Sequence, residues 1–151
     1  MNKDFVYDIE TYPNVFTFCA VYMNGNGLRV FEVSDRKDDT VSLLEFLRNV
    51  KTHGCRMVGF NNVGFDYPVI HHILQKSISC KKTNTQLVIT AKEMYDVAMG
   101  FIKNNSQFGS AVKQEDVLLE QVDLYKINHF DNKAKATSLK MLEFNMRSEN
   151  I

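Results

Sequence analysis

The chain has 151 residues, and 44% of them are hydrophobic, which is enough for one domain with a real core and argues against a disordered protein. Its 18 basic and 18 acidic residues cancel, so net charge does not draw it to nucleic acid, and any such binding must come from a local patch or from metal ions. No run approaches the ~20 apolar residues that span a membrane, and the polar start at Met1–Asp4 is unlike a signal peptide, so we expect a cytoplasmic protein with no membrane partner. The cysteines, Cys19, Cys55 and Cys80, follow no disulfide or zinc spacing and are expected to be reduced, with Cys19 buried in a strand.

The first predicted strand, Asp4–Thr11, is short and apolar and ends in two carboxylates. Side chains alternate along a strand, so Asp8 and Glu10 point to one face while Tyr7 and Ile9 point to the other. Two adjacent anionic groups at the end of a buried strand repel each other unless a cation or a proton lies between them. Oxygen ligands favour Mg²⁺ or Mn²⁺. The alternative is a strand that runs into a solvated acidic turn.

Two further strands follow closely. Tyr12-Pro13 ends the first strand, and Val15–Met23 is rich in the β-branched and aromatic residues that strands favour. The two Asn-Gly pairs of Asn24–Gly27 predict a hairpin turn, and Leu28–Val33 returns as a third strand. The three strands are expected to form a meander.

A helix and a buried strand come next. Asp38 and Asp39 supply the acidic residues that a helix N-terminus favours, and Gly54 is a plausible stop. The apolar stripe between them is expected to cover the sheet; it consists of Val41, Leu44, Leu47 and Val50, with Leu43 and Phe46 beside it. Arg56–Phe60 resembles a buried parallel strand behind a crossover helix.

The segment after that strand, Asn61–Pro68, is predicted to be a loop that opens a helix. Pro68 suits the first turn, and the buried side is expected to be Val69, Ile70, Ile73 and Leu74. Asp66 therefore lies where a strand, a loop and a helix meet, either as a site residue or as a simple N-cap. The adjacent His71 and His72 face different directions and are interpreted as surface or packing residues.

The remaining chain is predicted to contain two helices and one strand. Residues 76–86 are expected to be a loop, and the capping-box pattern from Thr90 begins a helix that runs to about Lys103. Residues 117–127 are expected to contain the last strand. Its Asp123 is either a further acid near the site or merely a strand-end carboxylate, and we favour the latter.

The C-terminal part is the most basic. After a loop at 128–135, Thr137 or Ser138 is expected to cap a terminal helix with Leu139, Leu142 and Met146 pointing inward. The basic residues form either a solvated face or a track for a phosphate backbone; they are Lys126, Lys133, Lys135, Lys140 and Arg147.

Two motifs in this order carry a family resemblance. Asp8-x-Glu10 at the end of the first strand, followed by Asn61-x-x-x-Phe65-Asp66 before a helix, resembles the first two motifs of DEDD (DnaQ-like) 3′–5′ exonucleases. The context is most similar to the proofreading regions of family B and tailed-phage DNA polymerases, and it extends to His129–Lys133 and Ser138–Ser148. The resemblance implies one α/β domain over residues 1–151 with a ribonuclease H-like fold. In that fold three antiparallel strands and then parallel strands make a five-stranded mixed sheet with flanking helices.

The resemblance also implies roles for particular residues. Asp8 would bridge two metal ions, Mg²⁺ or Mn²⁺, Glu10 would hold the ion that activates water, and Asp66 would help to hold the second ion through water. The terminal nucleotides of a single-stranded DNA 3′ end would contact the Thr11 backbone, Asn61 and Phe65, with Phe65 packing on a base or sugar. The partners implied are single-stranded DNA and the rest of a polymerase or other replication proteins, in a host cytoplasm if the protein is phage-encoded.

One departure from the family pattern bears on activity. The family's fourth carboxylate, with a Tyr or His before it, has no counterpart after Asp131, where Glu143 and Glu149 are the only acids. We therefore expect that the chain stops before the third exonuclease motif. A second hypothesis follows from this, namely a catalytically incomplete module that binds nucleic acid or a replication partner. A nuclease that acts on RNA is a third, because the motifs do not distinguish a 2′-hydroxyl.

Overall fold

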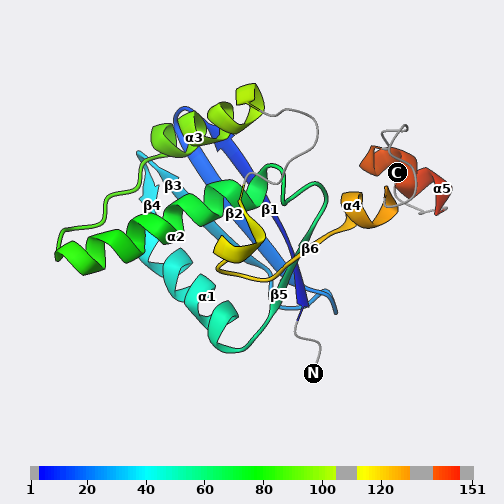
Figure 1. Cartoon of the computed structure of the whole chain (residues 1–151), viewed down its shortest axis with the longest axis horizontal. Coiled ribbons are helices and arrows are strands. Elements are labelled where there is room, and N and C mark those ends of the chain that lie inside the picture. The colour runs from blue at the N-terminus through cyan, green and yellow to red at the C-terminus, as the bar shows by residue number, and fades with distance from the viewer. Residues whose placement is uncertain (1–3, 105–111, 130–137, 147–151) are drawn as a thin grey trace.

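The computed structural model of the protein describes residues 4–104, 112–129 and 138–146 (Figure 1). Its described strands form one sheet in the order β4-β3-β2-β1-β5-β6. The bounds are β1 (Asp4–Tyr12), β2 (Val15–Tyr22), β3 (Arg29–Ser34), β4 (Lys37–Asp38), β5 (Arg56–Gly59) and β6 (Gln121–Asp123). Neighbours from β4 to β1 pair antiparallel, whereas β5 and β6 run parallel to β1. This is the mixed sheet that the sequence predicts, antiparallel strands first and then parallel ones, with the two-residue β4 as a sixth strand.

Helices connect and cover these strands. They are α1 (Thr40–Thr52), α2 (Asp66–Thr83), α3 (Ala91–Asn104), the 3₁₀ helix η1 (Gln114–Asp116), α4 (Leu124–Asn128) and α5 (Leu139–Asn145). The capping box at the start of α3 is confirmed on one side, because the Glu93 amide donates to Thr90 Oγ1 over 3.2 Å. Among the described residues, no helix combines the length and the apolar character that crossing a membrane requires.

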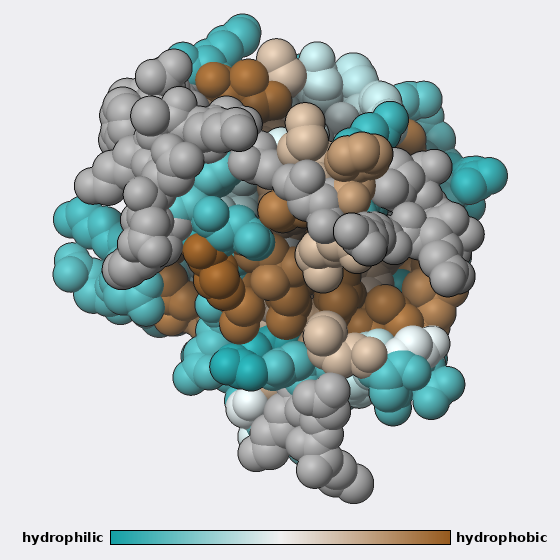
Figure 2. All heavy atoms as spheres, turned by 90° about the vertical axis from the view of Figure 1, so that its right-hand side faces the viewer, coloured by the Kyte–Doolittle hydropathy of each residue, from teal (hydrophilic) through white to brown (hydrophobic). Residues whose placement is uncertain are grey.

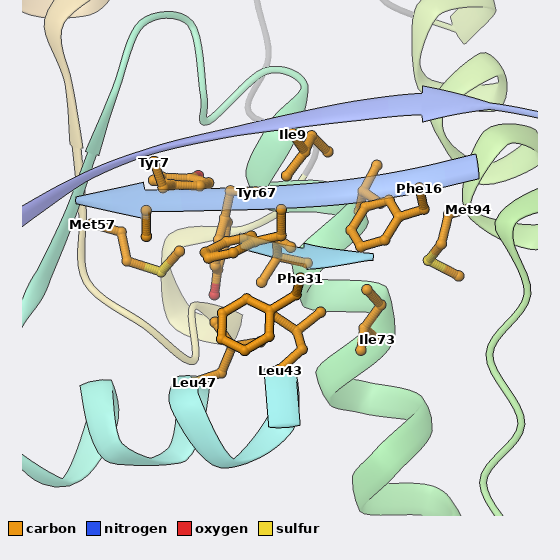
Figure 3. Packing of buried hydrophobic residues seen from close by; sticks show 14 of the residues in the cluster. Tyr7, Ile9, Phe16, Phe31, Leu43, Leu47, Met57, Tyr67, Ile73 and Met94 are labelled. Atoms are coloured by element: carbon orange, nitrogen blue, oxygen red, sulfur yellow. The ribbon is translucent and has the colours of Figure 1, made fainter. Parts of the chain in front are cut away.

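The hydrophobic core lies between one face of the sheet and the helices. The odd-numbered residues of β1, Phe5, Tyr7 and Ile9, are buried there. Figure 3 shows Leu43 and Leu47 of α1 pointing toward the sheet, together with side chains from α2 and α3. The even-numbered residues of β1 belong to the opposite face and are exposed from position 6 to position 10.

The first helix begins just after the acidic pair Asp38-Asp39, and not with it. Asp38 belongs to β4, and α1 begins at Thr40, whose amide donates to Asp38 Oδ1 over 2.9 Å. Asp39 occupies the N-cap position but makes no side-chain cap, because its Oδ2 accepts the Glu32 amide over 2.9 Å. Both carboxylates therefore hold the β3–β4 turn and the strand-to-helix junction.

The predicted loop at 76–86 is wrong, because α2 continues as a helix through Thr83. The segment is polar, which is typical of loops, but polar residues also occur on the exposed side of a helix. Lys76 donates to both oxygens of Glu93 on α3 over 2.7 Å, so a polar side chain on α2 has a tertiary partner. The helix ends at Asn84, which adopts the left-handed conformation (φ 53°) common at helix C-termini.

The predicted strand at 117–127 is also too long. Only Gln121–Asp123 pairs with β5, and the chain then turns at once into α4. The reason is that β5 ends at Gly59, opposite Asp123, so no partner strand continues. The Asp123 side chain caps α4 by accepting the amides of Tyr125 and Lys126.

The terminal helix is confirmed, but of its three predicted inward residues only Leu142 is half-buried. Ser138 caps α5 by accepting the Met141 amide over 3.2 Å. Leu139 is 47% exposed and Met146 is 79% exposed, so neither points into a core, and Figure 1 shows α5 lying beyond α4. Most of the predicted loop at 128–135 lies outside the described residues, as do three basic residues of the proposed track, Lys133, Lys135 and Arg147.

Candidate active site

The two carboxylates of β1 lie where alternation predicts. Asp8 and Glu10 are both exposed on the face that the core does not cover. In the antiparallel register Asp8 is opposite Cys19 and Glu10 is opposite Thr17. Burial raises the pKa of the Cys19 thiol, and the charges of Asp8 and Glu10 raise it further, which places the three groups close together. Cys19 is only half-buried, so its predicted burial is wrong in degree.

Asp66 is fixed at the first residue of α2. The N-cap position belongs to Phe65, which makes no side-chain cap, so the interpretation of Asp66 as a simple N-cap is wrong. Its Oδ1 instead accepts the Ile9 amide of β1 over 3.3 Å, and the residue is only 7% exposed. This contact is available because the pairing of β5 with β1 ends at Val6, leaving later amides of β1 without that strand beside them.

The electrostatics of this corner link Asp66 to Asp8. The pKa of Asp66 is raised from 3.8 to about 7, first by burial and then by the negative charge of Asp8. The bond from the Ile9 amide acts in the opposite direction, and Asp123 adds a smaller rise. Asp66 therefore lies within electrostatic reach of Asp8 in a place where a proton or a cation stabilises the pair.

These groups suit a hard divalent cation. Asp8, Glu10 and Asp66 offer carboxylate oxygens. Burial and the charge of Asp8 make the ionised form of Asp66 costly, and a bound cation would lower that cost. Within the described ranges, no three His, Cys, Asp or Glu side chains already form a cluster that could hold a metal. Mg²⁺ is commonly held by one or two carboxylates together with waters and substrate phosphates, so the pair of Asp8 and Asp66 fits that pattern.

The loop before α2 is tightly built. Asn61 has a left-handed backbone (φ 59°), which is rare for a residue other than glycine. A Cβ on Gly59 would lie 2.7 Å from the Asn62 Cβ, and a Cβ on Gly64 would lie 2.9 Å from Asn61 Oδ1. Asn62 is fully buried and donates from Nδ2 to Gln121 Oε1 over 2.9 Å. Close approach therefore requires a glycine at 59, whereas at 64 the near atom is the end of the Asn61 side chain, which can turn away.

The three residues predicted to contact nucleotides lie at the edges of this corner. Thr11 is half-buried near the end of β1, and Asn61 is exposed on the loop. Phe65 is half-buried and packs partly against the hydrophobic core. The structure thus brings Asn61 and Phe65 onto one loop that ends at Asp66. Within the part of the chain that the structure describes, no side-chain hydrogen bond joins these three residues to Asp8, Glu10 or Asp66.

Sequence reasoning undervalued Asp123. It is 6% exposed, and it accepts the Asn61 amide at Oδ1 over 2.9 Å and the Val63 amide at Oδ2 over 3.2 Å. Its charge also reaches Asp66. The signal that could have found it is topological, since an acid at the carboxyl end of a parallel strand lies at the same edge as the ends of its neighbours.

The two histidines of α2 agree with their interpretation as surface or packing residues, His71 being buried and His72 half-buried. His71 is buried beside Tyr67, with 5.6 Å between ring centroids. His72 Nε2 lies 2.9 Å from Glu93 Oε1.

A comparison with protein families agrees with the two motifs. A family model described as a predicted 3′–5′ exonuclease related to the exonuclease domain of PolB matches residues 6–89, which is more than half of the chain. No curated protein matches. Among solved structures, the family B DNA polymerase of the hyperthermophilic archaeon Pyrobaculum calidifontis is similar, with 17% identity and a TM-score of 0.45. That match covers 95% of this chain, which spans 18% of the polymerase's length.

Proposed function

The chain belongs to the family of predicted 3′–5′ exonucleases related to the exonuclease domain of PolB, and from this premise we propose that it removes nucleotides from the 3′ ends of single-stranded DNA. The reaction would depend on two Mg²⁺ or Mn²⁺ ions. The observation that carries the proposal is the bond from the Ile9 amide to the Asp66 carboxylate, which holds a buried acid against the strand that carries Asp8 and Glu10 on its exposed face. Burial first, and then the charge of Asp8, raise the pKa of Asp66 to about 7. A buried acid with a raised pKa is typical of a functional site.

Each acid has a distinct part in this proposal. Asp8 and Glu10 would hold the ions from the exposed face of β1, while Asp66 would complete the set from the start of α2. The ions would supply an activated water and neutralise the charge that develops on the phosphate and on the leaving 3′ oxygen. Asp66 must lose its proton to serve as a ligand, so its tie to the Ile9 amide helps by favouring the ionised form.

The substrate contacts come from the loop and from the end of β1. Asn61 is exposed and can donate to or accept from a nucleotide, and the uncovered part of Phe65 can pack on a base or sugar. Stacking accepts any base, which suits an enzyme that trims single strands. Thr11 would contribute its backbone beside the two acids of β1.

The family relation also supports a place beside a polymerase. The name of the family refers to the exonuclease domain of PolB, a DNA polymerase. We therefore propose that residues 1–151 form one exonuclease unit that works with a polymerase or other replication proteins.

The test is degradation of a 5′-labelled single-stranded oligonucleotide in Mn²⁺. We expect a ladder that shortens from the 3′ end, that stops at a 3′ phosphorothioate block, and that disappears in Asp8→Ala. Asp96→Ala is the matched control, because Asp96 is a half-exposed acid on α3 that pairs with Lys92. An RNA oligonucleotide of the same sequence distinguishes a deoxyribonuclease from a ribonuclease.

Two results would contradict the proposal. A ladder that persists in Asp8→Ala would place the chemistry elsewhere. Absence of cleavage by the chain, combined with tight binding of the oligonucleotide in an anisotropy titration, would establish the non-catalytic binding module instead.

A further inference from the structure

We propose that Asp123 is a positioning residue of the exonuclease site: its carboxylate holds the loop Asn61–Phe65 in place through two main-chain amides. The inference deepens the proposed function and rests on it. Asp123 lies outside residues 6–89, which are those that the family model matches. Its role follows from the contacts of β6 alone.

The two contacts grip the loop on both sides of Asn62. Asp123 Oδ1 accepts the Asn61 amide over 2.9 Å, and Oδ2 accepts the Val63 amide over 3.2 Å. Both bonds join a carboxylate to backbone donors, and Asp123 is only 6% exposed, so water competes little with them. Because each oxygen has its own donor, the carboxylate fixes the orientation of the loop as well as its position.

The loop needs such an anchor. Asn61 carries the left-handed backbone (φ 59°), a conformation that persists only where the surroundings impose it. The bond from Asp123 is made at this same residue. Without this bond, the left-handed conformation of Asn61, in which its side chain is exposed for a nucleotide, should be less populated.

A second tie secures the far end of the loop. The Tyr67 amide donates to the Asn62 carbonyl over 2.8 Å, and the Tyr67 hydroxyl accepts the amides of Leu118 and Leu119, over 2.7 and 3.2 Å. Thus the residue after Asp66 is joined to the segment that leads into β6. Asp66 lies between two connections to the same part of the chain.

The carboxylate also couples the loop to α4. Oδ1 accepts the amides of Tyr125 and Lys126 in addition to that of Asn61, and the Tyr125 ring packs edge-on against Phe60 with 5.5 Å between centroids. Phe60 directly precedes the loop. Asp123 is therefore the point where β6, α4 and the loop meet.

The arrangement permits a graded test. In Asp123→Asn one oxygen can still accept the Asn61 amide and cap α4, but the new amide group faces the Val63 N–H, donor against donor. In Asp123→Ala both loop contacts and the cap are lost. Asp39→Asn is the matched control, because Asp39 is also a carboxylate that accepts a backbone amide, that of Glu32, at the other edge of the sheet.

We expect kcat/KM on a single-stranded 3′ end to fall about 10-fold in Asp123→Asn and about 100-fold in Asp123→Ala, and to stay within about 2-fold in Asp39→Asn. Hydrogen exchange gives a readout independent of activity. In Asp123→Asn the Val63 amide should exchange faster while the Asn61 amide stays protected, and both should exchange faster in Asp123→Ala. A thermal unfolding curve for each variant confirms that it is folded.

The outcomes separate the positioning role from the proposed function. Unchanged exchange at both amides, or an unchanged kcat/KM in a folded Asp123→Ala, overturns the inference. A merely structural role would lower the melting temperature of Asp123→Asn and leave kcat/KM as in the control, which also overturns it. If the wild-type chain fails to cleave, the proposed function fails, and oligonucleotide binding together with exchange at Asn61 and Val63 still decides whether Asp123 positions the loop.

Discussion

The two faces of β1 have different surroundings although they alternate residue by residue. Phe5, Tyr7 and Ile9 are 2–4% exposed in the core, whereas Asp8 and Glu10 are exposed on the other face. Seen from the right-hand side of Figure 1, the surface has a band of hydrophobic side chains between hydrophilic regions (Figure 2). Exposed apolar residues on the carboxylate face include Val6 at 40% and, on β3, Val30 at 53%.

This difference separates stability from chemistry along a single strand. The core face contributes hydrophobic burial and holds β1 in register with its neighbours. The other face presents charged side chains that remain in contact with solvent and add little to folding, so they are free to bind a ligand. Substitutions at successive positions should therefore alter either unfolding or cleavage, and seldom both.

The largest expected effect is on the core face. Phe5→Ala removes a ring that packs against Phe46 with 5.4 Å between centroids, and it should lower the free energy of unfolding by about 3–5 kcal/mol. Urea unfolding followed by circular dichroism measures it. A loss below about 1 kcal/mol would mean that the core face is not what stabilises the strand.

The largest effect on the other face should be on activity. Glu10→Gln keeps the size of an exposed side chain and removes its charge, so cleavage should fall more than about 100-fold while the free energy of unfolding changes by less than about 0.5 kcal/mol. Oligonucleotide cleavage and urea unfolding of the same preparation test both. A variant that cleaves normally would remove Glu10 from the site.

An intermediate effect should come from Asp66, whose carboxylate accepts the Ile9 amide of β1. Its pKa rises from 3.8 unfolded to about 7 folded, so from pH 4 to pH 7 the folded state holds the proton more tightly. Raising the pH through this range should therefore lower stability, by about 1.4 kcal/mol and a few degrees of melting temperature for each pH unit, with no further loss above it from this group.

Melting temperatures between pH 5 and pH 8 measure this slope in metal-free buffer. Asp66→Asn should flatten it, and Mn²⁺ should raise the melting temperature more at pH 8 than at pH 5, because ligation needs the ionised acid. An identical slope in Asp66→Asn would show that another group titrates.

The smallest effect should come from an exposed apolar residue beside the acids. Val6→Thr should change the free energy of unfolding by less than about 0.5 kcal/mol and leave cleavage within about 2-fold. The same two assays measure it. A large loss of stability would show that the carboxylate face is covered in solution.

Local patterns predicted much of this architecture. Alternation in β1 placed Asp8 and Glu10 on one face, and Asn-Gly pairs predicted the β2–β3 turn, because each depends on neighbouring residues. The limits of α2 and β6 depended on distant partners. Lys76 is helical beside Glu93 of α3, and β6 is short because β5 is short.

The sequence motifs selected candidate residues for the site, but they did not predict the hydrogen bonds that hold these residues in place. Motif spacing selected Asp66, but its bond to the Ile9 amide and its raised pKa depend on the point where β5 stops. Asp123 was undervalued because its partners, Asn61 and Val63, are main-chain amides, and a sequence does not show where a backbone donor points. Metal binding and the nucleotide contacts of Thr11, Asn61 and Phe65 stay predictions.

The long reach of Asp123 has a consequence for the order in which the molecule is assembled. Val63 and its acceptor are 60 residues apart in sequence, whereas the β1–β2–β3 meander closes over short turns. Contacts between distant residues require the closure of a large loop, so they form late and slowly. On a ribosome, Asp8, Glu10 and Asp66 all emerge well before position 123. The meander can pair while the nascent chain is still short, and the loop Asn61–Phe65 gains its anchor only when β6 arrives.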